Sequence, residues 1–193
     1  IRDSAPGIRV TGGPDLNVFN ACAVRALSHD CPGVTLSPEL SGEDIALLCN
    51  RLGDSGQVSV LVQGNIPAMI TADTLLDLVR ERGDHRKRSS EYTAMIYGIE
   101  DTTGRIFPVH HDPWGRTHIL NAAELCLIDY LPDLARAGVD SWIIDARWRG
   151  PSYAAGMVSV YRDAVENMPW MAGDLTSAGH IQALKTRIRA MAQ

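Results

Sequence analysis

The sequence has no long hydrophobic run and no recognisable export signal. No window approaches the roughly 18 apolar residues that cross a bilayer, so we expect no membrane-spanning helix. The first residues, Ile1-Arg2-Asp3-Ser4, lack the basic start and apolar stretch of a secretory signal. These absences favour a cytoplasmic protein with no membrane partner. Because the chain begins with isoleucine rather than methionine, we also expect a segment upstream of it.

Closely spaced cysteines are missing too. The four cysteines are Cys22, Cys31, Cys49 and Cys126, and no two of them form a C-x-x-C motif. This spacing argues against a zinc ribbon and against a thiol redox site. Because nothing indicates secretion, we expect reduced thiols, each behaving as a small buried apolar residue.

Basic residues are fewer than acidic residues. The 18 lysines and arginines against 23 aspartates and glutamates give a net charge of −5, so we expect no general affinity for nucleic acid or anionic membranes. The sequence contains no G-x-S-x-G elbow, H-E-x-x-H pair or phosphate-binding glycine loop. A conventional protease nucleophile is therefore not visible.

The length of 193 residues fits one domain, residues 1–193. Short β-type runs alternate with helical stretches, which predicts an α/β domain with parallel strands. We expect strands at residues 8–10, 34–36, 58–62 and 141–144, and helices at residues 19–27, 41–52, 71–82, 131–137, 153–166 and 177–191. Ser41 is the expected N-cap of the second helix and Gly53 its C-cap.

The segment 93–121 interrupts this alternation. Residues 93–99 and 105–110 flank a turn-rich connector, which predicts an inserted antiparallel β-hairpin. A second turn at residues 112–115 leads into a possible third antiparallel strand at residues 117–120. Four strand-then-helix units remain. Periodicity alone allows either a small open sheet or half of an eight-stranded barrel, which needs about 250 residues.

Three stretches resemble peptidase family U32, the collagenase-like protease family. They are Leu16-Asn17-Val18-Phe19-Asn20 followed by residues 34–40 (VTLSPEL), residues 107–109 (FPV) with 116–121 (RTHILN) and 125–128 (LCLI), and residues 137–141 (AGVDS) running to 144–147 (IDAR). The family patterns read approximately LNVFN, TLSPEL, LCLI and AGVDS-x-K-I-E-G-R. The resemblance covers residues 7–166 in order and spacing.

This resemblance implies the C-terminal half of a TIM-like (β/α)8 barrel, with the first half upstream. Four barrel strands alone would expose two edges, so we expect the chain to pack against the missing N-terminal half or against a second copy of itself. The family label further implies a hydrolase that acts on peptide or protein substrates.

Polar residues follow the predicted strands at the barrel end where function concentrates. They are Asp15 and Asn17, Ser37 and Glu39, Gln63 and Asn65, and Asp145 and Arg147. Because each pair follows a strand, we expect all of them at one rim, around a peptide or small-molecule ligand. We predict substrate-binding roles for Asn17, Asn20, Ser37, Asn65, Arg116 and Asp145.

Each candidate catalytic residue also has a structural interpretation. Glu39 could act as a general base or bind an ammonium group, or it could cap a helix or pair with an arginine. Arg147 could hold a carboxylate or phosphate, or pair with Asp145 or Glu39. His118 could be an acid or base near neutral pH, or a half-buried strand histidine satisfied by the backbone. Asn17 and Asn20 could simply organise turns.

Several U32 proteins hold a four-iron cluster on four cysteines and hydroxylate RNA bases or a quinone precursor without oxygen. Cys126 matches one of those ligands, but residues 70–124 contain no cysteine, and Thr74 stands where the first ligand would be. A cluster normally needs four thiolates, so we predict no cofactor and no metal.

Three functions remain open. The first is a U32 peptidase. The second is a non-catalytic relative that binds a ligand or partner, which the lost cysteines and the Asp145-Ala146-Arg147 sequence in place of E-G-R favour. The third is a hydroxylase-like protein that modifies RNA or a quinone.

Overall fold

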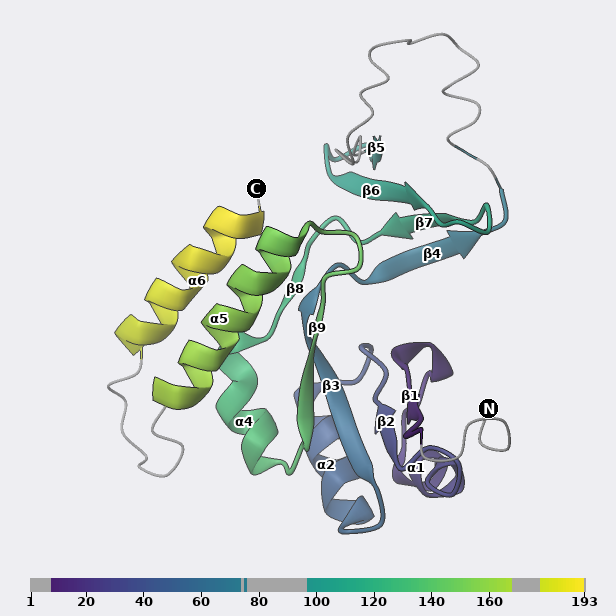
Figure 1. The fold of residues 1–193 in the computed structure, drawn as a ribbon, viewed down its shortest axis with the longest axis vertical. Coiled ribbons are helices and arrows are strands. Elements are labelled where there is room, and N and C mark those ends of the chain that lie inside the picture. Colours follow the sequence, from purple (N-terminus) through teal and green to yellow (C-terminus); the bar gives the residue numbers. More distant parts are fainter. Residues whose placement is uncertain (1–7, 74, 76–96, 168–177, 193) are drawn as a thin grey trace, which may run out of the picture. The chain divides into compact units, whose positions relative to one another are not determined.

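The computed structural model describes residues 8–73, 75, 97–167 and 178–192 (Figure 1). The chain divides into two compact units. Unit 1 comprises Ile1–Gly64 and Cys126–Gln193, and unit 2 comprises Asn65–Leu125. The proposal that residues 1–193 act as a single domain stays a prediction. None of the described helices has the length and apolarity that crossing a bilayer demands.

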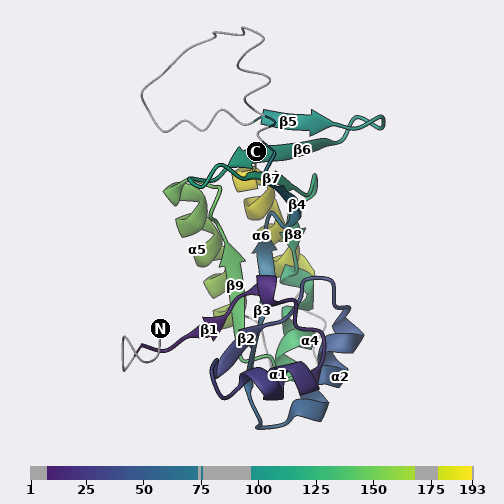
Figure 2. The ribbon, with the colours of Figure 1, turned by 90° about the vertical axis from the view of Figure 1, so that its right-hand side faces the viewer.

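Unit 1 is built on a parallel sheet. Strands β1 (Thr11–Gly12), β2 (Gly33–Thr35), β3 (Gln57–Gly64) and β9 (Ser141–Asp145) pair in that order, all parallel, and the short β8 (Leu125–Cys126) also joins β3. The helical elements are η1 (Pro14–Leu16), α1 (Ala21–Leu27), α2 (Gly42–Leu52), η2 (Ile128–Tyr130), α4 (Leu131–Arg136), α5 (Pro151–Asn167) and α6 (Ala178–Ala192). Figure 2 shows β1, β2 and β3 beside α1 and α2.

One predicted strand is misplaced. The first strand is Thr11–Gly12 rather than residues 8–10, and Ile8 is exposed. The physical reason is close packing at Gly12, where a Cβ atom would lie only 2.7 Å from Leu16 and 3.1 Å from Val34. Only glycine lets these side chains approach the strand so closely, and this approach fixes the pairing with β2.

Local capping sets the boundaries of α1, which begins two residues later than expected, and of α2. Helix α1 begins at Ala21 because the extended Asn20 accepts a hydrogen bond from the Ala23 N–H at 2.9 Å. Helix α2 begins after Ser41, whose hydroxyl accepts from the Asp44 N–H at 3.1 Å, and it ends at Gly53 with φ of 55°. The prediction of both α2 caps is confirmed.

The core of unit 1 lies between the parallel sheet and its helices. Val58, Val60 and Val62 of β3 share one buried cluster with residues of α2, α4, α5 and α6. Helices α5 and α6 lie side by side (Figure 1). The described residues therefore establish an α/β architecture, while the TIM-like half-barrel stays a prediction.

Unit 2 contains an antiparallel sheet in the order β4-β7-β6-β5. Its strands are β4 (Pro67–Thr71), β5 (Tyr97–Glu100), β6 (Ile106–His111) and β7 (Thr117–Leu120). The predicted hairpin appears as the antiparallel pair β5–β6, and the predicted third strand as β7. Strand β4 was not predicted. Thr71, the expected start of a helix, is its last residue, and most of that helix falls outside the described residues.

Candidate functional site

The loops that follow β1, β2 and β9 carry most of the polar residues expected at the rim. Because these strands are parallel, their carboxyl ends lie at one edge of the sheet. We call the set Asp15, Asn17, Ser37, Glu39, Asp145 and Arg147 the polar rim.

Asn17 and Ser37 tie the first two loops together. The Ser37 hydroxyl donates to Asn17 Oδ1 at 2.8 Å, and the Ser37 N–H donates to the Val18 carbonyl at 3.0 Å. Asn17 adopts a left-handed conformation with φ of 53°, which asparagine tolerates better than most residues. Ser37 is buried, and its hydroxyl proton is engaged by Asn17, so this side chain ties the two loops to each other.

Asp145 and Arg147 form a fork-like ion pair at the end of β9. Arg147 Nε lies 3.0 Å from both carboxylate oxygens, and Nη2 lies 2.7 Å from Oδ2. The hydrogen bonds and charge of Asp145, with a smaller contribution from Asp15, raise the pKa of Arg147 above its ordinary value. The ion pair with Asp145, one of the two alternatives for Arg147, is therefore present, although the Arg147 side chain remains 54% exposed.

Glu39 stands exposed beside this bonded framework. Its N–H lies 3.4 Å from the Ser37 hydroxyl, and among the described residues its carboxylate has no ion-pair or hydrogen-bond partner. The described residues show no ion pair between Glu39 and Arg147 or another arginine. Asn20 caps α1, as described above. Asn65 is half-buried directly after β3 and belongs to unit 2.

Gln63, which we expected at the rim, is instead fully buried. Its Nε2 donates to the Tyr153 hydroxyl at 3.3 Å, and the Tyr161 hydroxyl donates to Gln63 Oε1 at 3.0 Å and to the Val62 carbonyl at 2.9 Å. The pairing register with β9 shifts between Leu61 and Gln63. This irregularity breaks strict alternation, which is why strand periodicity misplaced the side chain.

In unit 2, His118 and Arg116 share one buried carboxylate. Asp112 Oδ2 lies 3.1 Å from His118 Nε2 and 2.6 Å from Arg116 Nε, while Oδ1 accepts from the backbone N–H groups of Trp114 and Arg116. Burial works to raise the pKa of Asp112, but these hydrogen bonds, led by that of His118, hold it well below the ordinary value.

His118 is thus a buried strand histidine, and one of its bonds goes to a carboxylate rather than to the backbone. Sequence reasoning missed Asp112 as the centre of this cluster. The available signal was its place four residues before Arg116 and six before His118, with a tight turn between them. Among the predicted catalytic residues, Glu39 and Arg147 belong to unit 1, whereas His118 belongs to unit 2.

The four cysteines are not gathered into one metal-binding group among the described residues. All four are free thiols within the described residues, and no group of three or more histidines, cysteines or acids that could hold a metal occurs in this part of the chain. A cluster normally requires four thiolate ligands, so Cys126 has no partners here.

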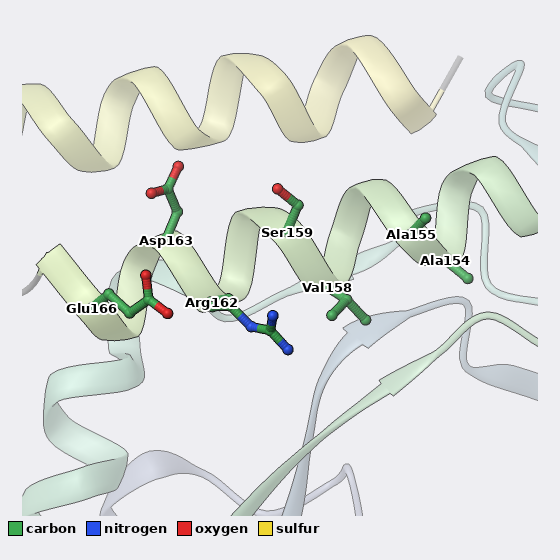
Figure 3. A pocket seen from close by; sticks show the side chains of 7 residues that line it. All are labelled: Ala154, Ala155, Val158, Ser159, Arg162, Asp163 and Glu166. Atoms are coloured by element: carbon green, nitrogen blue, oxygen red, sulfur yellow. The ribbon is translucent and has the colours of Figure 1, made fainter.

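A hollow of about 600 Å³ lies on the outer face of α5 (Figure 3). Its lining residues, including Val158, Arg162 and Glu166, all come from that one helix. Asp163, also part of the lining, is already paired with Arg187 of α6. Because a single helix supplies the whole wall, we do not count this hollow as a functional site.

Comparisons with known proteins identify the family. The curated tRNA hydroxylation protein P2 of Bacillus subtilis (strain 168) is 37% identical over 60 residues, which make up 31% of this chain and 19% of that protein. The matched stretch thus spans about a fifth of the relative's length. No solved structure matches. The sequence model of peptidase family U32 matches residues 1–189, and the chain therefore belongs to peptidase family U32.

Proposed function

We propose that the polar rim is the peptide-binding site of a U32 hydrolase. The observation that carries this proposal is the hydrogen bond from Ser37 to Asn17, which joins the loop after β1 to the loop after β2 that carries the exposed carboxylate of Glu39. Such a framework holds a reactive or binding group in place before the ligand arrives, which is what substrate binding requires.

The charge of the rim supports a peptide over a polyanion. Asp145 balances Arg147, so Asp15 and Glu39 leave the rim with an excess of negative charge. This charge attracts an ammonium group or a basic side chain and repels phosphates.

The chemistry that fits Glu39 is general base catalysis. Its carboxylate would take a proton from a water molecule as the water oxygen attacks the scissile carbonyl. The carbon–nitrogen bond then breaks, and the proton passes to the leaving amine. Arg147, whose side chain is half exposed, is suited to hold a peptide carboxylate.

The test compares Glu39→Gln with Asp54→Asn, which removes an equivalent exposed charge just before β3, at the opposite edge of the sheet. We expect Glu39→Gln to abolish cleavage of an unstructured protein and Asp54→Asn to leave it unchanged. Binding of a peptide with a free amino group, measured by calorimetry, separates the alternatives. Binding without cleavage in the unmodified chain would indicate a non-catalytic relative, and absence of both would refute the proposal.

RNA modification is the second candidate. Its support is the similarity to the tRNA hydroxylation protein P2. The negative rim opposes it. We propose that this chain holds no iron–sulfur cluster on its own cysteines, and stoichiometric iron and sulfide in protein purified without oxygen would overturn that proposal. The free thiols also support the proposed cytoplasmic location.

We further propose that another polypeptide covers the second face of the parallel sheet. Val58, Val60 and Val62 belong to the helix-covered core, whereas the alternate residues Ser59 and Leu61 lie outside that cluster, although both are buried within the chain. Parallel sheets are normally covered on both faces, so an upstream half-barrel or a second copy is the expected cover. Native mass spectrometry of the chain with and without its upstream segment would distinguish them, and a strictly monomeric, stable chain would contradict both.

A further inference from the structure

Strand β4 is an apolar edge strand with unusual exposure. In the sheet order β4-β7-β6-β5 it has a single neighbour, β7, among the described strands. Met69 is 56% exposed and Ile70 is 48% exposed. Consecutive strand residues point to opposite faces of a sheet, so β4 presents apolar surface on both faces.

The backbone of β4 adds hydrogen-bonding groups to this surface. A strand with one neighbour directs alternate N–H and C=O groups toward that neighbour and the remaining groups away from it. Among the described residues no strand pairs with the outer edge of β4. Its outer edge therefore offers both backbone donors and acceptors beside exposed apolar side chains.

The usual protections of an edge strand are few in β4. Natural edges carry lysines or other charges that prevent pairing with another chain. The segment Pro67-Ala68-Met69-Ile70-Thr71 contains no charged residue, and its protections are Pro67 and the register shift between Pro67 and Met69. The opposite edge strand β5 differs, because Glu100 lies within it. The open edge thus begins at Met69.

We propose that the outer edge of β4 from Met69 to Thr71 is a second peptide-binding site, which takes an extended, uncharged segment of the substrate as an added strand. Strand addition recognises a peptide through its main chain and places alternate side chains against the receiving strand. The inference rests on the proposed function, because it takes peptides as the substrate class. It differs from the polar rim in the chemistry recognised, which is main-chain and apolar rather than ionic.

The experiment uses a capped hexapeptide of alternating threonine and valine, because it carries no charge for the rim carboxylates to bind. We expect hydrogen exchange at residues 69–71 to slow when the peptide is added. The same peptide with every backbone nitrogen methylated should not bind, because it lacks all donors. A purely hydrophobic association would tolerate methylation, so equal binding of the two peptides would overturn the proposal.

Matched substitutions locate the site. Ile70→Lys should weaken binding of the hexapeptide at least tenfold. Ile106→Lys, at an isoleucine that is 59% exposed in β6, a strand of the same sheet that does not pair with β4, should leave binding unchanged. Equal loss in both variants would refute the assignment, and circular dichroism of each variant shows whether the fold is intact.

Two further outcomes are decisive. Slow exchange of residues 69–71 in the free protein, dependent on protein concentration, would show that a second copy occupies the edge and would overturn the peptide assignment. Binding of the hexapeptide to the Glu39→Gln variant should equal that of the unmodified chain. This comparison therefore tests the strand-addition site independently of the polar rim, even if the rim proves inactive.

Discussion

Asp112 accepts a hydrogen bond at 3.1 Å from His118, six residues later in the sequence and on the next strand. The same carboxylate oxygen lies 2.6 Å from Arg116 Nε. Both Asp112 and His118 are 8% exposed. One aspartate thus bonds to the turn between β6 and β7 and to the strand that follows it.

The first prediction concerns the pH dependence of this contact. The pKa of Asp112 is lower in the folded chain than its ordinary value, so the stability it contributes is fully present above about pH 4 and is lost as the pH falls further. We expect thermal unfolding of the unmodified chain to shift to lower temperature between about pH 4 and pH 2. The variant Asp112→Asn should be less stable at neutral pH and less sensitive to acid. Identical acid sensitivity in the two proteins would contradict the assignment.

The second prediction concerns the rim. Ser37→Ala removes the donor to Asn17 and should lower the free energy of unfolding by about 1 kcal/mol. It should also weaken peptide binding, because the loop that carries Asn17 loses its hydrogen bond to the loop that carries Ser37. Ser55→Ala, at an exposed serine before β3, is the control and should change neither quantity. Urea unfolding and calorimetry provide the two measurements, and unchanged peptide affinity would exclude a positioning role for Ser37.

The third prediction concerns Gly64 at the end of β3. Its φ is +136°, and a Cβ atom there would lie 2.5 Å from the Asp145 carbonyl oxygen. Gly64→Ala should therefore lower the free energy of unfolding by about 1–3 kcal/mol and weaken peptide binding through Asp145. Gly42→Ala is the matched control, since no atom lies within 4 Å of the added methyl group, and it should be neutral or slightly stabilising. Equal unfolding midpoints for both variants would contradict the close approach.

The fourth prediction concerns thiol reactivity. Burial, with a further contribution from the negative charge of Asp140, raises the pKa of Cys49, so less of it is thiolate at pH 8. Cys22 is exposed. We expect iodoacetamide to modify Cys22 first and Cys49 last. Mass spectrometry of tryptic peptides measures the extent of modification at each cysteine. Rapid modification of Cys49 in the folded chain would show that its surroundings open readily.

Capping residues and apolar periodicity predicted much of the fold, because each reflects interactions between residues that are close in the sequence. The caps at Ser41 and Gly53 and the helix expected at residues 177–191 are found in the structure. Each depends on residues within one or two helical turns. Strand β4 was missed for the opposite reason, since its sequence has no alternation and its conformation depends on pairing with β7.

The candidate site was only partly predictable. The order of strands indicated which loops share an edge, and the bond between Asn17 and Ser37 agrees with that expectation. The burial of Gln63 and the central position of Asp112 were not predicted. Both depend on contacts between residues of different elements, namely a register shift in one case and a turn between strands in the other.

The sequence by itself determined the α/β class, the caps of α2 and the family, because capping, periodicity and motif order are properties of neighbouring residues. It also led us to expect no cluster, because no two cysteines form a C-x-x-C motif and residues 70–124 contain no cysteine. Only the tertiary structure decided which side chains meet. Asp145 pairs with Arg147, Asp112 binds His118, and the apolar edge of β4 stays open among the described strands. These outcomes depend on distances across the fold, which the order of residues does not specify.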